Sequence, residues 1–155
     1  MNLLALLEKQ REEDRGMEGD FLPNKILQLQ IELGKLAENW RGHMYWDKDQ
    51  FPRHVEIIVS DGECGTEIYN RYPLLESYLS CLRWILSIGN EVEIGIYYSE
   101  KYRFDSEIDA FQYIYHETSL FANGDDWKEI FNAFLALGVM LDIDWNEVEK
   151  NMLED

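Results

Sequence analysis

Residues 23–41 read PNKILQLQIELGKLAENWR, and this stretch decides the fold class. Its apolar side chains recur at intervals of three and four residues, which places them on one face of an α-helix. Asp20 and Pro23 open the segment, and Gly42 is its expected end. We therefore predict a helix of roughly 18 residues that buries one apolar face.

The same spacing extends over most of the remaining chain. Further helices are predicted over residues 3–15, 73–88, 106–121, 127–141 and 145–153. Pro73 starts one of them, and the pair Gly89-Asn90 marks its end. Residues 91–98 either extend this helix or form a connecting segment, and we favour the helix. Two other starts carry the spacing of a capping box, at Asp126 with Glu129 and at Asp144 with Glu147.

One central segment lacks the helical period. Val55, Ile57, Ile58 and Val59 form an apolar run that fits either a strand or a helical turn. We interpret the residues near 47–72 as an irregular insertion. The sequence therefore predicts an all-α bundle of about six helices, with the whole chain as a single helical domain.

The charge balance excludes some partners. The 155 residues contain 31 acidic and 14 basic side chains, which gives a formal net charge of −17. Nucleic-acid binding depends on cationic side chains, so the phosphate backbone of DNA or RNA is excluded as the main partner. An acidic membrane surface is disfavoured for the same reason. A cation-dependent site and a basic protein partner remain open.

The cysteines and the hydropathy indicate a compartment. Cys64 and Cys81 lie 17 positions apart without a CxxC motif, a pattern that favours a reducing environment over a disulfide scaffold. We find no secretory signal and no run of about 18 apolar residues that would span a bilayer. We therefore expect a cytoplasmic protein.

Three stretches carry a family resemblance. Residues 25–41 with Tyr45-Trp46 resemble the first metal-binding helix of the dimeric all-α dUTPases, which belong with the MazG-like nucleotide pyrophosphohydrolases. Residues 74–89 resemble the second metal-binding helix of that family, and residues 135–141 with 145–149 resemble its closing helices. The resemblance implies a helical, homodimeric protein that acts on a deoxyuridine nucleotide.

The resemblance also implies a magnesium site, and this chain departs from it. The family uses two helical pairs of carboxylates to bind Mg²⁺, which activates water for attack on the phosphates. The four matching positions here are Glu32, Lys35, Ser77 and Ser80, so one carboxylate of four is retained. The ammonium of Lys35 would stand where a cation should bind. Two other acids are possible substitute ligands, namely Glu38 and Glu76.

Four further residues are candidates for nucleotide binding. Gln10 stands at a position that resembles the one at which the family recognises the edge of the uracil base. The other three are Asn39, Arg41 and Trp46, which lie at or after the end of the first metal-binding helix. Met44 stands where the family has a lysine in this aromatic segment. The side of the site that would hold the phosphates therefore also lacks a cation.

Three functions follow from these observations. The first is a dUTPase-like protein that has lost magnesium-dependent hydrolysis and keeps a binding or regulatory role. The second is an active pyrophosphohydrolase for dUTP or a related nucleotide, with a metal site shifted to Glu32, Glu38 and Glu76. The third is an acidic interaction module on the same scaffold that binds a basic protein surface.

Overall fold

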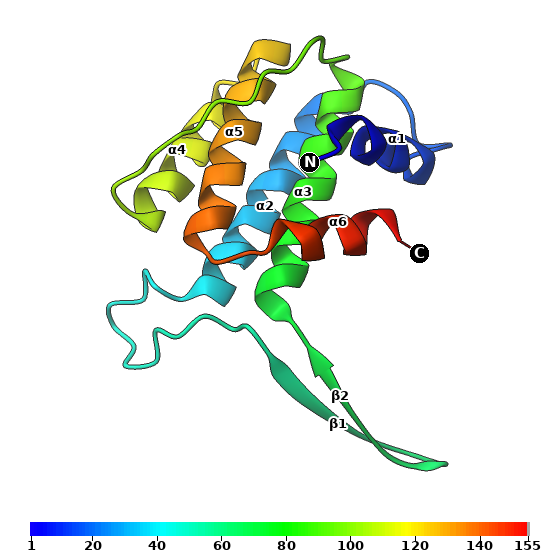
Figure 1. Cartoon of the computed structure of the whole chain (residues 1–155), viewed down its shortest axis with the longest axis vertical. Coiled ribbons are helices and arrows are strands. Elements are labelled where there is room, and N and C mark those ends of the chain that lie inside the picture. The colour runs from blue at the N-terminus through cyan, green and yellow to red at the C-terminus, as the bar shows by residue number, and fades with distance from the viewer. Residues whose placement is uncertain (155) are drawn as a thin grey trace.

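The computed structural model describes residues 1–154, which form six α-helices and one β-hairpin (Figure 1). In chain order the elements are α1 (Leu3–Glu13), α2 (Leu22–Trp40), β1 (Glu56–Gly62), β2 (Gly65–Arg71), α3 (Pro73–Glu91), α4 (Glu107–Ser119), α5 (Gly124–Met140) and α6 (Trp145–Leu153). The six predicted helices are therefore present, with ends shifted by a few residues.

The helices form a body around α3. Helix α2 packs along α3, α5 and α4 lie on one side of this pair, and α1 and α6 contact α3 from the other direction (Figure 1). Aromatic side chains fill the centre, where the ring of Tyr78 stacks on Phe134 with centroids 4.2 Å apart. Its hydroxyl donates to the Phe134 carbonyl at 3.0 Å, and burial raises the pKa of Tyr78, so the phenol stays protonated.

The expectation of an all-α fold was wrong, because part of the presumed irregular insertion is an antiparallel hairpin. Strand β1 pairs with β2 from Glu56 opposite Arg71 to Gly62 opposite Gly65, so the fold contains both α and β structure. Val59 pairs directly with Ile68, and β-branched side chains of this kind favour strands. We call residues 56–71 the arm, because the hairpin projects away from the helices (Figure 1).

The expected helix over residues 91–98 was also wrong. Helix α3 ends at Glu91, and the backbone turns at Glu93, which has a φ of 53°. The Ile94 N–H donates to the Gly89 carbonyl at 3.2 Å, and the Glu93 N–H donates to Asn90. This pair of hydrogen bonds is a Schellman motif, which ends a helix by satisfying its last carbonyls. Residues 92–106 then run over α5 without regular secondary structure.

Helix α5 begins three residues earlier than expected, at Gly124 and not at Trp127. Asn123 is the N-cap of α5, and Asp126 completes the capping box from inside the first turn, where it had been expected to be the cap itself. Asp144 caps α6 as predicted and accepts from the Asn146 N–H. Within residues 1–154, no helix is both long and apolar enough to cross a membrane.

Candidate functional site in the α2–α3 groove

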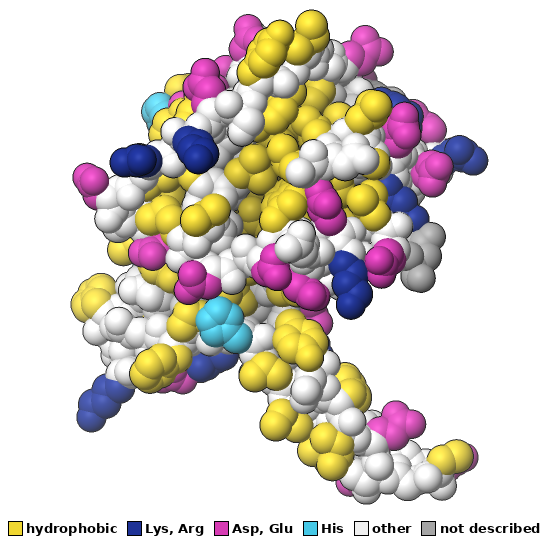
Figure 2. Space-filling model, in the orientation of Figure 1, with side chains coloured by type: hydrophobic (Ala, Val, Ile, Leu, Met, Phe, Trp, Pro, Cys, Tyr) yellow, Lys and Arg dark blue, Asp and Glu magenta, His cyan; other side chains and the backbone are white. Residues whose placement is uncertain are grey.

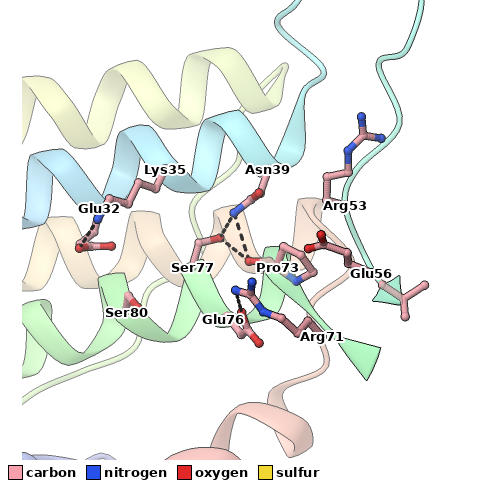
Figure 3. A pocket seen from close by; sticks show the side chains of 11 residues that line it. Glu32, Lys35, Asn39, Arg53, Glu56, Arg71, Pro73, Glu76, Ser77 and Ser80 are labelled. Carbon is pink, nitrogen blue, oxygen red and sulfur yellow. Dashed lines mark hydrogen bonds and ion pairs between the residues drawn. The ribbon is translucent and has the colours of Figure 1, made fainter. Parts of the chain in front are cut away.

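A cavity of about 680 Å³ lies where α2, α3 and the base of the arm meet (Figure 3). We call it the polar pocket. Its walls are Glu32, Lys35, Asn39, Arg53, Val55, Glu56, Arg71, Pro73, Glu76, Ser77 and Ser80. Three of these side chains are cationic and three are carboxylates, so the pocket has no net formal charge although the whole chain is strongly acidic.

All four positions singled out by the family resemblance line the polar pocket. Glu32 and Lys35 are three residues apart on α2, and Ser77 and Ser80 are three apart on α3, a spacing that places both members of a pair on one helix face. The two faces point toward each other across the groove (Figure 3). The structure therefore brings these four side chains into one cavity.

The carboxylate of Glu32 already has two partners. Lys35 Nζ lies 3.2 Å from Glu32 Oε1, and Gln28 Nε2 donates to the same oxygen at 3.0 Å. The lysine therefore neutralises the only carboxylate among the four matching positions. The Lys35 side chain is more than half exposed, whereas the Glu32 side chain is mostly covered.

The hydroxyl of Ser77 is occupied in the same way. It donates to the Pro73 carbonyl at 2.8 Å or to the Leu74 carbonyl at 3.0 Å, and it accepts from Asn39 Nδ2 at 3.1 Å. Serine within a helix commonly bonds back to the preceding turn in this manner. Ser77 therefore joins α3 to the end of α2 and has no general base to activate it.

The donors of the polar pocket do not fit a magnesium ion. Mg²⁺ prefers an octahedral set of oxygens with more than one carboxylate, and nowhere in residues 1–154 do three His, Cys, Asp or Glu side chains gather as ligands. Glu76 is paired with Arg71 at 2.9 Å. Glu38 is exposed and lies outside the pocket wall, so the shifted set of Glu32, Glu38 and Glu76 is not assembled.

The base of the arm and the segment that leads into it contribute pocket residues that the sequence did not point to. The Arg53 N–H donates to the Asn39 carbonyl at 2.8 Å, and the Arg53 carbonyl accepts from the Leu74 N–H at 2.9 Å, so Arg53 bridges α2 and α3. Its guanidinium bonds to Asp49 at 2.6 Å and holds the pKa of that carboxyl below its ordinary value. Hydrogen bonding to Glu76 likewise raises the pKa of Arg71.

A second cavity, of about 690 Å³, continues the groove toward the other end of α2. We call it the apolar pocket. It is lined by Asp14, Gly16, Met17, Glu18, Phe21, Asn24, Lys25, Leu27, Gln28, Ile31, Trp84 and Ser87. One hydrogen bond links the two pockets. Gln28 lines the apolar pocket and donates to Glu32, which lines the polar pocket.

Ser87 sets the apolar pocket apart from an ordinary surface hollow. This residue is 2% exposed, and its hydroxyl has no hydrogen-bond partner within the described chain. Buried polar atoms are nearly always paired, because an unpaired one loses its bonds to water without replacement. A ligand or water that bonds to Ser87 would satisfy it.

The predicted nucleotide-binding residues are only partly gathered at the groove. Asn39 lines the polar pocket, and Gln10 is buried in α1, where its Nε2 donates to Asp14 of the apolar pocket at 3.0 Å. The Gln10 Oε1 is buried without a partner. Arg41 instead bonds to Asp47 at 2.7 Å, and Trp46 is 65% exposed, so neither of these two lines either pocket.

Comparisons with known proteins do not identify the chain. No protein-family model matches it, and searches among curated proteins and among solved structures found no match. The resemblance to the all-α dUTPases therefore remains a prediction from the sequence.

Proposed function

We propose that this chain is a dUTPase-like protein that binds a nucleotide in the α2–α3 groove and does not hydrolyse it with magnesium. The observation that carries the proposal is the adjacency of two unlike pockets, one with cations and hydroxyls and one with aromatic and aliphatic walls. A nucleotide has the same division between its phosphates and its base. We further propose that the protein is cytoplasmic.

The polar pocket supports binding of phosphates without a metal. Lys35, Arg53 and Arg71 each have a carboxylate partner, with Glu32, Asp49 and Glu76 respectively. Arginine binds phosphate oxygens in the same bidentate geometry that it uses for carboxylates. A phosphate would therefore replace or share these partners, and the exchange predicts a modest affinity.

The apolar pocket supports binding of the base. Phe21 and Trp84 provide aromatic surface for stacking, and Leu27 and Ile31 provide aliphatic surface. The unpartnered Ser87 hydroxyl lines this pocket and is available to a hydrogen-bonding group on the base edge, whereas Gln10 reaches the pocket only through its hydrogen bond to Asp14. The amide of Gln28, which lies between the pockets, is placed to contact the sugar.

Calorimetric titration with dUTP in EDTA tests this proposal directly. We expect binding without metal and no pyrophosphate release when Mg²⁺ is added. The variant Lys35→Gln should weaken binding about tenfold, because it removes one charged partner of the phosphates. The matched control Lys128→Gln changes a lysine on α5 that pairs with Asp125, outside both pockets, and should bind like the wild type.

Two outcomes would contradict the proposal. One is the absence of binding to dUTP and to the other common nucleotides. The other is magnesium-dependent release of pyrophosphate that Glu32→Gln abolishes. A reversal variant tests the register independently, since Lys35→Glu with Ser77→Glu and Ser80→Asp restores the four carboxylates and should create Mg²⁺ binding in the polar pocket.

A further inference from the structure

The segment between α3 and α4 borders a third cavity, on the surface of α5. We call residues 92–106 the strap, because they cross α5 without regular secondary structure (Figure 1). Between the strap and α5 lies the strap cavity, which has a volume of about 510 Å³. Small-molecule sites commonly have volumes of about 300–1,000 Å³, so the strap cavity has room for one ligand. It shares no lining residue with the polar pocket or the apolar pocket.

One face of α5 forms the floor of the strap cavity. The lining residues of this helix follow intervals of three and four, and they are Asn132, Leu135, Ala136, Val139 and Met140. Four of the five are apolar, and Val139 is 75% exposed. Figure 2 shows hydrophobic side chains gathered over α5. From Asn132 to Val139 the floor extends about 10 Å along the helix, so it fits an apolar chain of that length.

Asn132 is the polar residue of this floor, and its donors are unused. The residue is 4% exposed, and its Oδ1 accepts from the Tyr97 hydroxyl and, at 3.3 Å, from the Glu100 N–H. A backbone N–H can only donate, so these bonds hold the oxygen toward the strap and leave Nδ2 with two N–H donors. Within residues 1–154, Nδ2 has no hydrogen-bond partner. Buried donors are nearly always paired, so Nδ2 indicates an acceptor atom on a bound molecule.

The strap adds two cations to the cavity wall. Lys101 and Arg103 line the cavity, and neither bonds to another residue that the structure describes. Among the described residues of the wall Glu100 is the only carboxylate, so two cations and one anion give a net formal charge of +1 in a chain of −17. The cations of the polar pocket differ, because each of them has a carboxylate partner. An anion is therefore the group that the strap cations attract.

We infer that the strap cavity binds a small amphipathic carboxylate, with its apolar chain along the floor and its carboxylate between Asn132 and the strap cations. The apolar floor disfavours a ligand that is polar throughout, such as free phosphate, because it offers such a ligand no hydrogen bonds. An amine is disfavoured because its charge would face two cations and the fixed N–H donors of Asn132. The Tyr102 hydroxyl donates to Glu129 of α5, so the strap is fixed in place before a ligand arrives. The inference is independent of the nucleotide proposal.

Calorimetric titration with octanoate, at concentrations below micelle formation, tests the charge requirement. We expect octanoate to bind, and octanol, which has the same chain without the charge, to bind at least about tenfold more weakly. Lys101→Gln with Arg103→Gln should weaken octanoate binding about tenfold and leave octanol binding unchanged. The matched control Lys48→Gln with Lys150→Gln removes two charges at exposed positions outside the cavity, and it should bind octanoate like the wild type.

Two changes on α5 test the floor and the amide. Val139→Asp places a carboxylate on the apolar floor and should abolish octanoate binding, and the fold should be retained because Val139 is exposed. Asn132→Asp keeps the acceptor for Tyr97 and Glu100 and replaces the two donors with an anionic oxygen, so binding should fall more than about tenfold. The NMR signals of the Asn132 side-chain amide should shift when octanoate is added to the wild type, and this measurement does not require a folded variant.

Three results would overturn the inference. The first is the absence of octanoate binding by the wild type at millimolar concentration, and the second is octanol binding as tight as that of octanoate. The third is octanoate binding that survives both Val139→Asp and the double change of Lys101 and Arg103, because the ligand would then occupy another cavity, such as the apolar pocket. Loss of binding in these variants together with a shift of the Asn132 amide signals would support the inference.

Discussion

The helical body and the arm use the same aliphatic residues in opposite ways. Ile85 of α3 is 0% exposed, whereas Ile68 of β2 is 70% exposed. Apolar side chains stabilise a fold in proportion to the surface that they remove from water, so the body gains this free energy within one chain and the arm does not. The difference indicates that the body maintains the fold and that the aliphatic side chains of the arm contribute little to it.

Truncating one isoleucine in each region should give the largest contrast. Ile85→Ala leaves a cavity in the core and should lower the free energy of unfolding by about 2–5 kcal/mol. Ile68→Ala removes a side chain that is mostly in water and should change it by less than about 0.5 kcal/mol. Urea denaturation at a protein concentration low enough to favour monomers measures both. A comparable loss in the two variants would mean that the arm is part of the core.

The body was predictable from the sequence, and the arm was not. The helices have apolar residues at intervals of three and four because each buries one face, and that interval is visible in a single chain. In β1 the consecutive residues Ile57, Ile58 and Val59 point to alternate faces, so apolar side chains stand on both faces and the alternation of apolar and polar residues that reveals a strand is interrupted. The turn at Glu63-Cys64 also lacks the Asn-Gly pair that predicts a hairpin.

The residues of the candidate site also differ in how far the sequence predicts them. Glu32, Lys35, Ser77 and Ser80 could be assigned to one cleft, because helix spacing fixes the faces on which they lie. Arg53 and Arg71 could not be assigned to it, since they reach the pocket through the base of a hairpin that was not foreseen. Arg41 and Trp46 line neither pocket, because they lie at and beyond the end of α2, where Arg41 is the left-handed C-cap with a φ of 65°.

Substituting a glycine in the body and one in the arm should give a smaller difference in the free energy of unfolding than the isoleucine pair. A Cβ on Gly138 of α5 would lie 2.8 Å from Cζ of the buried Tyr78 ring, which its hydrogen bond to Phe134 holds in place. Gly138→Ala should therefore lower the free energy of unfolding by about 1–3 kcal/mol, although alanine favours a helix by about 1 kcal/mol over glycine. Thermal and urea denaturation both measure this loss.

Gly62 is the matched position in the arm. A Cβ there would have only the Gly65 carbonyl oxygen within 4 Å, at 3.8 Å. Gly62→Ala should change the free energy of unfolding by no more than about 0.5 kcal/mol. If Gly138→Ala proved neutral as well, the packing around Tyr78 would be looser than the buried ring contacts indicate.

The smallest expected change in stability is at Glu149, which joins the start of α1 to α6 through hydrogen bonds. Glu149 accepts from the Asn2 N–H and from Trp145 Nε1, each at 2.9 Å, and these bonds hold its pKa below the ordinary value of 4.5. Because the pKa is lower in the folded state, this contribution to stability is complete above the ordinary value and disappears as the pH falls through the lowered pKa. Glu149→Gln should therefore lower the free energy of unfolding by less than about 1 kcal/mol near neutral pH, and its difference from the wild type should vanish in acid.

The control variant Glu76→Gln breaks an ion pair with Arg71 at the base of the arm. Both side chains of that pair are about half exposed, so the loss of stability should be smaller still. Urea denaturation at several pH values separates the two variants, and a Glu149→Gln deficit that persisted in acid would show that packing of the side chain, rather than its charge, joins the two helices.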